Sequence, residues 1–274
     1  MLEYFTNPFI LRALVAIIIM AAISGVIGSF TVFRGFSFLI AGIAHSAMAG
    51  AALAIFLDYY QIIPHLNPLA GALLFGFIVA FIVGYMIQKN GTETVDVAVG
   101  ISFAMSMSLA ILFISMIREY AVQAWVLIMG DLLLLTVFDL ILLIIITSLT
   151  VFLTVLFYRE MLLISFDMEY ALALGLRVSL YNYLMLALIT LSVIVLLKGV
   201  GAILVYVFLV IPAAAANNIS KTVSMVMILA TLFALISGLV GLFIAFFIDV
   251  APSALAGLIA LLIYVITLFI KKSS

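Results

Sequence analysis

His45 is the side chain in this sequence that is best suited to bind a metal ion. It lies near the middle of an apolar stretch, within the run Ala-Gly-Ile-Ala-His-Ser-Ala-Met-Ala-Gly. Neutral imidazole is a common ligand of transition metals, and an ionisable group deep in an apolar segment is a candidate functional residue. The plainer alternative is a histidine that donates one hydrogen bond to a neighbouring helix, and the residues alone slightly favour this alternative.

The neighbours of His45 suggest a path. At helical spacing, Ser37, Ala41, His45 and Ala49 share one narrow and weakly polar face. Such a face could line a route for a small ion, and Ser37 and Ser46 are therefore candidate path residues. Serine hydroxyls in apolar helices also form hydrogen bonds between helices. A role in a path and a role in helix packing therefore both stay open.

Three further residues are candidates for a path or a gate. Asp139 is expected deep in an apolar stretch, where a carboxylate needs a partner or a wet cavity. Asp131 is expected at the end of a span. Pro212 removes a backbone hydrogen bond from a segment rich in small residues, and such a break is tolerated in a membrane only inside protein or beside water.

Small residues predict close contacts between helices. Two ridges have the spacing that lets membrane helices approach each other, and their members are Gly42, Ser46 and Gly50, then Gly100, Ala104 and Ser108. For either ridge alone, tight structural packing is the favoured interpretation. Together the ridges suit a bundle whose helices pack closely and rearrange.

The composition predicts an integral membrane protein. Apolar residues make up 69% of the 274 residues and charged residues only 8%, whereas soluble domains have about a quarter charged residues. A formal net charge of −1 argues against a nucleic-acid partner, and the absence of cysteine excludes disulfides and thiolate metal sites. No phosphate-binding loop motif is present, so any ATP must be hydrolysed by another subunit. We expect a single transmembrane domain over residues 1–274, without a cleaved signal peptide.

Apolar runs of the length that a bilayer requires indicate about eight or nine transmembrane helices. The expected spans are Pro8–Phe33, Ser37–Leu57, Pro68–Gln88, Val97–Ile117, Leu132–Phe157, Leu180–Leu197, Val200–Ala216, Thr222–Ile248 and Pro252–Ile270. The segment Val200–Ala216 is short and could pair with its predecessor as a hairpin, so eight spans are equally defensible.

The basic residues predict the orientation of the chain in the membrane. Nine spans place Arg34, Lys89, Arg159, Arg177, Lys221, Lys271 and Lys272 on one side, and Arg118, Lys198 and Arg12 on the other or near it. The more basic side is expected to be cytoplasmic. We therefore predict a multi-pass protein of the cytoplasmic membrane with a cytoplasmic C-terminus.

The stretch Tyr158–Arg177 is too polar to span a membrane, yet it has helical periodicity. Asp167 can cap a short helix, with Glu169 in the favourable first turn, and Gly175 can end it. This segment, at about 158–178, is either a docking element on the cytoplasmic side or a helix lying on the lipid headgroups. The residues alone favour neither interpretation over the other.

Several ordered blocks resemble the permease subunits of bacterial and archaeal ABC importers for zinc, manganese or iron. The blocks are Phe33-Arg34-Gly35-Phe36-Ser37, Ala44-His45-Ser46-Ala47 with Gly50, Glu93–Gly100, Met129–Leu133, Phe166–Gly175, Gly199–Val205 with Ile211–Ala214, Gly241-Leu242 and Asp249–Ser253. Each block is weak alone, but their order and spacing over nearly the whole chain are specific.

The resemblance implies an all-α, type II importer fold in which two copies of the permease pair around a translocation path. It implies two cytoplasmic ATPase subunits and an extracellular or periplasmic metal-binding protein as partners. The chain would then be a transport subunit and not an enzyme, without a bound cofactor, and the divalent metal would be its cargo.

The resemblance also assigns roles to particular residues. It favours docking to the ATPase for the segment that contains Phe166, Asp167, Glu169, Ala171 and Gly175, and it makes His45 the leading ligand of the path. One position departs from the pattern: Ala41 stands where many relatives have aspartate. A site built on His45 without that carboxylate would hold a divalent cation more weakly.

Three other functions fit the residues less well. A permease for a bulky chelate such as haem, a siderophore or a cobamide usually has about ten spans and a longer chain. A secondary transporter tends to have paired intramembrane carboxylates or inverted repeats, and only Asp139 is expected to lie deep here. A structural scaffold is disfavoured by the docking motif.

Overall fold

All regular secondary structure in the described residues is helical. This computed structural model describes residues 7–90, 95–117, 130, 132–248 and 250–270. The elements are α2 (Pro8–Ile23), the π-helical turn η1 (Ser24–Gly28), α3 (Ser29–Phe33), α4 (Ser37–Tyr59), α5 (Pro68–Asn90), α6 (Val95–Met116), the 3₁₀ turn η4 (Leu132–Leu134), α8 (Val137–Leu156), α9 (Tyr158–Phe166), α10 (Met168–Ala173), α11 (Val178–Val200), α12 (Ala202–Ile219), α13 (Val223–Ile248) and α14 (Pro252–Ile270). The predicted all-α class is confirmed.

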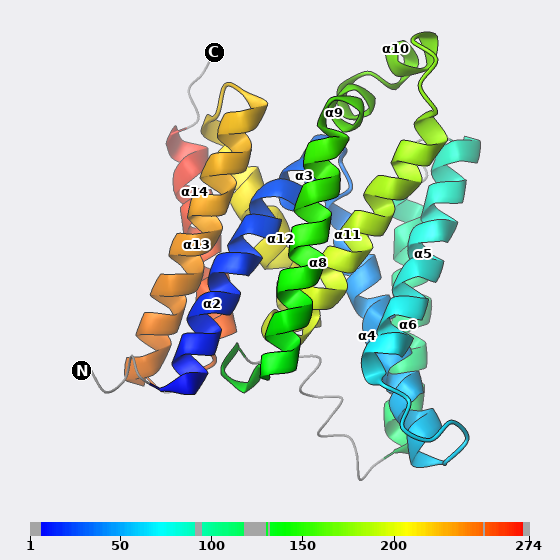
Figure 1. Ribbon diagram of the computed structural model, residues 1–274, viewed down its shortest axis with the longest axis vertical. Coiled ribbons are helices and arrows are strands. Elements are labelled where there is room, and N and C mark those ends of the chain that lie inside the picture. The colour runs from blue at the N-terminus through cyan, green and yellow to red at the C-terminus, as the bar shows by residue number, and fades with distance from the viewer. Residues whose placement is uncertain (1–6, 91–94, 118–129, 131, 249, 271–274) are drawn as a thin grey trace.

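The described helices form one bundle with two ends (Figure 1). Eight helical segments in this part of the chain are long and apolar enough to cross a bilayer, and α12 contributes a shorter apolar helix. Because α11 runs toward the lower end in Figure 1 and α13 begins at the upper end, α12 returns across the bundle. The structure therefore gives α12 a separate pass, and α2 begins at the end opposite to the one where α14 finishes.

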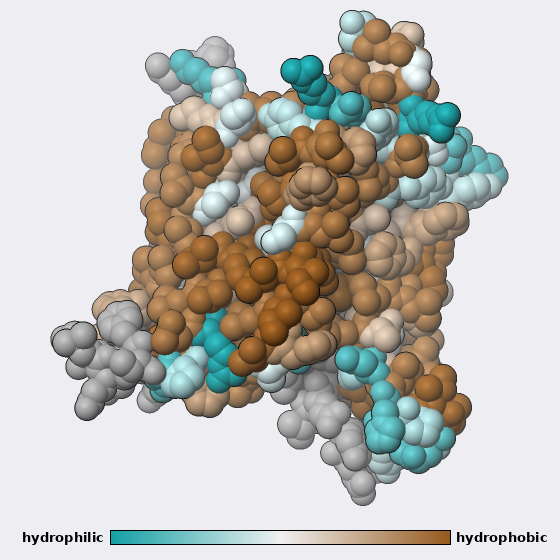
Figure 2. Space-filling view, in the orientation of Figure 1, coloured by the Kyte–Doolittle hydropathy of each residue, from teal (hydrophilic) through white to brown (hydrophobic). Residues whose placement is uncertain are grey.

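The charged residues gather at the two ends, as the sequence predicted. The ends of α3, α5 and α12 and the beginnings of α9, α11 and α13 lie in the upper half of Figure 1, whereas the beginning of α2 and the end of α11 lie in the lower half. Arg34, Lys89, Arg159, Arg177 and Lys221 are at or next to the upper helix ends in the sequence, and Arg12 and Lys198 are near the lower ones. Arg118, Lys271 and Lys272 fall outside the described residues. Between the two ends, the face seen in Figure 2 is mostly apolar, which is the surface that a lipid bilayer requires.

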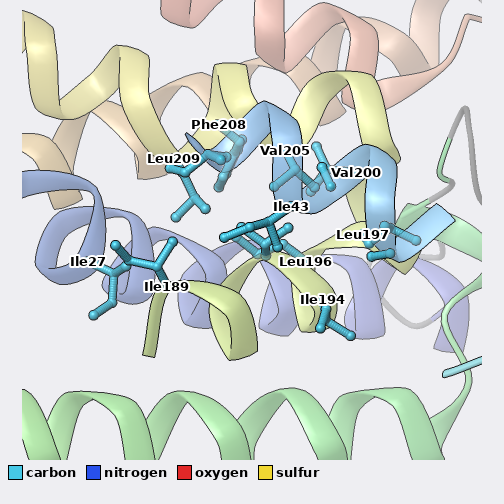
Figure 3. Close-up of a cluster of buried hydrophobic side chains, with 14 of the residues drawn as sticks. Ile27, Ile43, Ile189, Ile194, Leu196, Leu197, Val200, Val205, Phe208 and Leu209 are labelled. Carbon is cyan, nitrogen blue, oxygen red and sulfur yellow. The ribbon is translucent and has the colours of Figure 1, made fainter. Parts of the chain in front are cut away.

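α4 and α11 form the centre of the bundle. In the 18-residue apolar stretch of α4, 78% of the residues are buried, and in that of α11 67% are buried. The corresponding share in α6 is 22%. Branched aliphatic side chains fill the space between α4, α11 and α12, among them Ile43, Ile189 and Leu209 (Figure 3). The helix that carries His45 is therefore held on several sides by the rest of the chain.

The first small-residue ridge packs as the sequence predicted, and the second does not. A Cβ atom added to Gly50 would lie 2.0 Å from the carbonyl oxygen of Gly71, and one added to Gly42 would lie 2.7 Å from a methyl group of Val99. α4 thus contacts α5 almost backbone to backbone, and it contacts α6 through a side-chain methyl group. A Cβ atom at Gly100 would meet no described atom within 4 Å, so the ridge on α6 is an open surface of this chain.

The expected span Leu132–Phe157 begins later than predicted. Leu132–Leu134 form a 3₁₀ turn, and Thr136 caps α8, which starts at Val137. A run of leucines looks like continuous helix in an apolar profile, but the hydroxyl of Thr136 and the carboxylate of Asp139 form a capping box that fixes the start. Asp139 is therefore in the first turn of α8 and not deep in the span.

Candidate metal path and coupling segment

His45 is half-buried on α4, and its ring is held in one tautomer. Nδ1 lies 2.8 Å from the carbonyl oxygen of Ala41, one turn earlier on the same helix. Because a carbonyl can only accept, Nδ1 carries hydrogen in this contact, and Nε2 keeps its lone pair when the imidazole is neutral. The ring also contacts Phe103 of α6, with 4.4 Å between ring centroids. A backbone carbonyl that orients a histidine in this way is a usual companion of metal-binding imidazole.

The predicted face of α4 is only partly open. Ser37, Ala41 and His45 are each partly exposed, whereas Ala49 is fully buried. The line of exposure therefore runs from the beginning of α4 to His45 and does not continue past it on this face. Gly42, Ile43, Ala44 and Ser46 beside this line are buried, so Ser37, Ala41 and His45 form an accessible strip in this part of α4.

Ser46 lies beside this strip and faces the interior. Its hydroxyl contacts the hydroxyl of Ser106 at 2.8 Å and donates to the carbonyl of Gly42 at 2.7 Å. Both serines are buried. The hydroxyl of Ser46 is thus used in a contact between α4 and α6, which is the alternative use of serine that the sequence left open.

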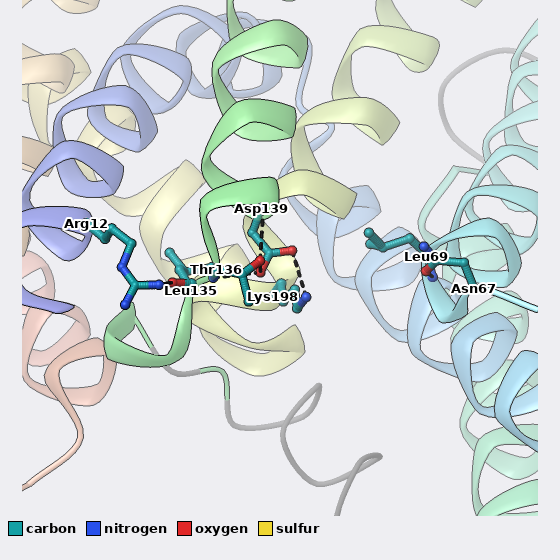
Figure 4. Close-up of polar contacts among 7 residues, drawn as sticks. All are labelled: Arg12, Asn67, Leu69, Leu135, Thr136, Asp139 and Lys198. Carbon is teal, nitrogen blue, oxygen red and sulfur yellow. Dashed lines mark hydrogen bonds and ion pairs between the residues drawn. The ribbon is translucent and has the colours of Figure 1, made fainter. Parts of the chain in front are cut away.

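Asp139 forms a polar cluster at the lower end of the bundle (Figure 4). Its carboxylate accepts from the ammonium group of Lys198 at 2.7 Å and from the hydroxyl of Thr136 at 2.6 Å. Nearby, the guanidinium of Arg12 donates to the carbonyl of Leu135 at 2.8 Å. The cluster joins α2, α8 and α11 at one end, and Asp139 has the partner that the sequence required.

Lys198 is a partner that the sequence analysis missed. It was counted only as a charge on the less basic side, and it stands 59 positions after Asp139. A single sequence contains no local signal for such a pair, because the two residues meet only when α8 and α11 pack together. Asp131 lies outside the described residues, and Pro212 is buried inside α12.

The stretch Tyr158–Arg177, called the coupling segment below, has the caps that the sequence predicted. The carboxylate of Asp167 accepts from the backbone nitrogen of Tyr170 at 2.8 Å, and Glu169 is in the first turn of α10. Gly175 has a φ of 77°, and the nitrogen of Leu176 donates to the carbonyl of Ala171 at 3.1 Å. This is a Schellman ending, in which a left-handed glycine stops the helix. Figure 1 shows α10 standing outside the bundle at its upper end.

Within this segment, Ala171 does not have the exposure that a docking contact needs. It is fully buried and packs with Ile164 and Val178 of the same chain. The exposed apolar side chains of the segment are instead Phe166, Tyr170, Leu172 and Leu174, each more than half exposed. Asp167, Glu169 and Gly175 are also exposed. Exposed apolar groups gathered outside the spans favour a protein contact.

Among the described residues, no three histidine or carboxylate side chains come together as a metal site. Among the predicted path residues that the structure describes, His45 is the one with an imidazole, and the carbonyl of Ala41 orients its ring. A single imidazole would hold a cation only weakly.

Known proteins resemble this chain over nearly its whole length. A family model, the ABC 3 transport family, matches residues 6–271. The manganese transport system membrane protein MntC of Listeria monocytogenes is 32% identical over 96% of this chain and 91% of its own. The chelated iron transport system membrane protein YfeD of Yersinia pestis is 27% identical over 97% of this chain and 86% of its own.

A solved structure gives the same fold. The structure of PsaBC from Streptococcus pneumoniae in complex with Fab superposes with a TM-score of 0.84 and 28% sequence identity, covering 98% of this chain and 96% of that chain. The family model and the fold thus cover essentially the entire bundle. This chain belongs to the ABC 3 transport family and is a multi-pass membrane permease of that family.

Proposed function

We propose that this permease carries a divalent transition metal ion into the cytoplasm, with energy from ATP hydrolysed by separate subunits. The observation that carries the proposal is His45, which combines a partly exposed ring on the central helix with a lone pair at Nε2. Manganese is the first candidate ion, because the relative from Listeria monocytogenes is named as a manganese transport protein. Zinc and iron are the other candidates.

Weak binding at His45 suits a transport role. A path must bind an ion strongly enough to admit it and weakly enough to release it. Ala41 contributes only its backbone carbonyl to orient the imidazole, and it lacks the carboxylate that would hold a divalent cation longer. The strip from Ser37 to His45 then leads the ion along α4 toward the upper end of the bundle.

The upper end is assigned to the cytoplasm. Its excess of described lysine and arginine side chains supports this side under the positive-inside rule. The C-terminus is then cytoplasmic and the beginning of α2 lies on the outer side. With this orientation, α9 and α10 face the cytoplasm, where ATPase subunits are expected, and the Asp139 cluster lies at the outer end of the bundle.

The docking surface for an ATPase subunit is formed by the exposed side chains of α10 and its flanks. Tyr170 and Leu172 present apolar surface, and Glu169 adds a charge beside them. A second copy of the permease is the remaining partner. Pairing doubles each polar group on the path, and the open small-residue ridge of α6 offers a surface for close approach.

Reconstitution tests the proposal directly. The permease, its ATPase and its binding protein are placed in liposomes, and ATP-dependent uptake of Mn²⁺, Zn²⁺, Fe²⁺ and a ferric chelate is measured in parallel. We expect uptake of at least one free divalent ion. His45→Ala should reduce that uptake at least about tenfold, the scale of losing one metal ligand or its support, while expression and ATPase binding stay normal.

A matched control separates a path residue from general damage. His65 lies in an exposed loop with a φ of 61°, and asparagine tolerates that backbone, so His65→Asn should transport at the parent rate. Uptake of the chelate alone would favour the chelate permease instead. Parent-rate uptake by His45→Ala would show that the histidine is only a contact between helices. The family match already disfavours a secondary transporter or a scaffold.

A further inference from the structure

Arg34 joins the coupling segment to the helix that carries His45. It caps the end of α3, and α4 begins three positions later, after Gly35 with a φ of 68°. One guanidinium nitrogen donates to the carbonyl of Ile164 at 2.6 Å, in the last turn of α9, and the other donates to the side-chain oxygen of Asn182 on α11. One side chain thus bridges three elements that are far apart in the sequence.

Other contacts extend this junction to α10. The amide nitrogen of Asn182 contacts the sulfur of Met168 at 3.9 Å, and Met168 is the first residue of α10. The ring of Phe33, next to Arg34, packs against Phe166 with 5.5 Å between centroids. The corner between α3 and α4 is therefore in direct contact with α9, and it is linked to α10 through Asn182 of α11.

In the part of the chain that the structure describes, no carboxylate pairs with the guanidinium of Arg34. Its hydrogen-bond acceptors among the described residues are a carbonyl and an amide, both neutral, and its plane lies over the ring of Phe36 at 4.9 Å. Burial lowers the pKa of Arg34 because the charge is partly removed from water, although a guanidinium stays protonated at physiological pH. Nε is buried without a partner in the described chain. Because a buried charge needs its acceptors, α9 and α11 cannot leave the corner at low cost.

On this basis we propose that Arg34 is a positioning residue that transmits movement of the coupling segment to α4. The inference rests on the proposed function, in which α9–α10 meets the ATPase and α4 lines the path. Displacement of α9 pulls on the guanidinium and so on the beginning of α4. Because α4 is a rigid, largely buried helix, the movement reaches His45, roughly 12 Å along the axis from Ser37 at 1.5 Å per residue.

The chain offers a closely matched control for Arg34. Arg12 also donates to the backbone carbonyl of a distant segment, Leu135, and its guanidinium also lies over an aromatic ring, Phe9, at 4.7 Å. It is, however, at the opposite end of the bundle. Arg34→Gln and Arg12→Gln remove the same kind of contact, and only the first lies between the coupling segment and α4.

The first measurement is the amount of metal transported per ATP hydrolysed by the reconstituted complex. We expect Arg34→Gln to lower this ratio about tenfold, a coupling effect of ordinary size, while ATPase binding and hydrolysis continue. Arg34→Lys should lower the ratio less, because an ammonium group keeps the charge but lacks the planar set of donors that reaches both acceptors. Arg12→Gln should keep the parent ratio. An unchanged ratio in Arg34→Gln, or an equal loss in Arg12→Gln, overturns the proposal.

A second measurement does not depend on the cargo. Hydrogen–deuterium exchange of the complex in nanodiscs is compared with and without ATP, in the first turns of α4 and in α10. In the parent and in Arg12→Gln, ATP should change exchange in both places, and in Arg34→Gln only in α10. A response of α4 that survives in Arg34→Gln, or is missing in the parent, rejects the relay. Absence of metal uptake by the parent complex instead rejects the proposed function, and the exchange data still decide the role of Arg34.

Discussion

The hydroxyl of Ser24 donates to the backbone carbonyl of Phe208 across a distance of 2.6 Å, in the buried contact between η1 and α12. Phe208 stands four positions before Pro212, which has no N–H group to give to that carbonyl. The serine on the π-helical turn of the first span thus supplies the hydrogen bond that the proline removes. Gly28 lets the two segments approach, since a Cβ atom there would lie 2.1 Å from the carbonyl of Leu209.

This relationship predicts the effect of Ser24→Ala. Loss of the hydroxyl leaves a buried carbonyl unpaired, so the variant should be less stable by about 1–2 kcal/mol, the upper range for hydrogen bonds between membrane helices. In a Pro212→Ala background, a backbone N–H can pair with Phe208 again, and Ser24→Ala should then cost less. Thermal unfolding of the parent, the two single variants and the double variant measures how far Pro212→Ala reduces the effect of Ser24→Ala.

Ser192→Ala is the control for this cycle. The hydroxyl of Ser192 is also buried and donates to a carbonyl, but that carbonyl belongs to Leu188 in its own helix, where the backbone N–H of the next turn is already its partner. The melting temperature should therefore change little. Equal losses in Ser24→Ala with and without Pro212 would contradict the pairing.

Asp139 and Lys198 should contribute unequally to stability. The carboxylate of Asp139 also closes the capping box of α8 through Thr136, whereas the side chain of Lys198 is 37% exposed. Asp139→Ala should cost about 1–3 kcal/mol for the lost cap and the unpaired donors. Lys198→Ala should cost about 1 kcal/mol or less, because water screens an exposed partner. The melting temperatures of the two variants test this ranking. A larger decrease in melting temperature in Lys198→Ala than in Asp139→Ala would disprove it.

Ala41→Asp should strengthen metal binding on the path. The new carboxylate would stand one helical turn before His45 and add an oxygen ligand to its imidazole. We expect about tenfold tighter retention of Mn²⁺, or about 1.4 kcal/mol, together with slower turnover because the ion is released less easily. Equilibrium binding of Mn²⁺ to the purified complex measures the gain. The double variant Ala41→Asp/His45→Ala should lose this tighter Mn²⁺ binding. If the double variant still binds Mn²⁺ more tightly than the parent, the site does not include His45.

Leu172→Arg should break the contact with the ATPase without disturbing the permease. Leu172 is 58% exposed on α10, whereas Ala171 beside it is fully buried. Leu172→Arg should therefore abolish co-purification with the ATPase at an unchanged melting temperature. Ala171→Arg should lower the melting temperature as well, because the arginine cannot fit against Ile164 and Val178. Normal assembly of the Leu172→Arg complex would exclude this face as the docking surface.

Local patterns were sufficient to predict most of the helices and the caps of the coupling segment. Spans such as Pro252–Ile270 agree with the sequence to the residue, and Asp167 and Gly175 delimit α10 as expected. These features depend on residues within a few positions of one another: a bilayer-length apolar run, a capping carboxylate, a glycine that tolerates positive φ. For the same local reason, the run Leu132–Leu135 misled the prediction, because an apolar profile does not distinguish helix from a 3₁₀ turn.

The tertiary structure alone decided which residues meet. Lys198 and Asp139, Ser24 and Phe208, and Arg34 and Ile164 are separated by 59, 184 and 130 positions. The exposure of Leu172 and the burial of Ala171 likewise depend on how α10 rests against α9 and α11. Such contacts arise because helix packing brings distant faces together, and neither periodicity nor composition along one chain carries that information.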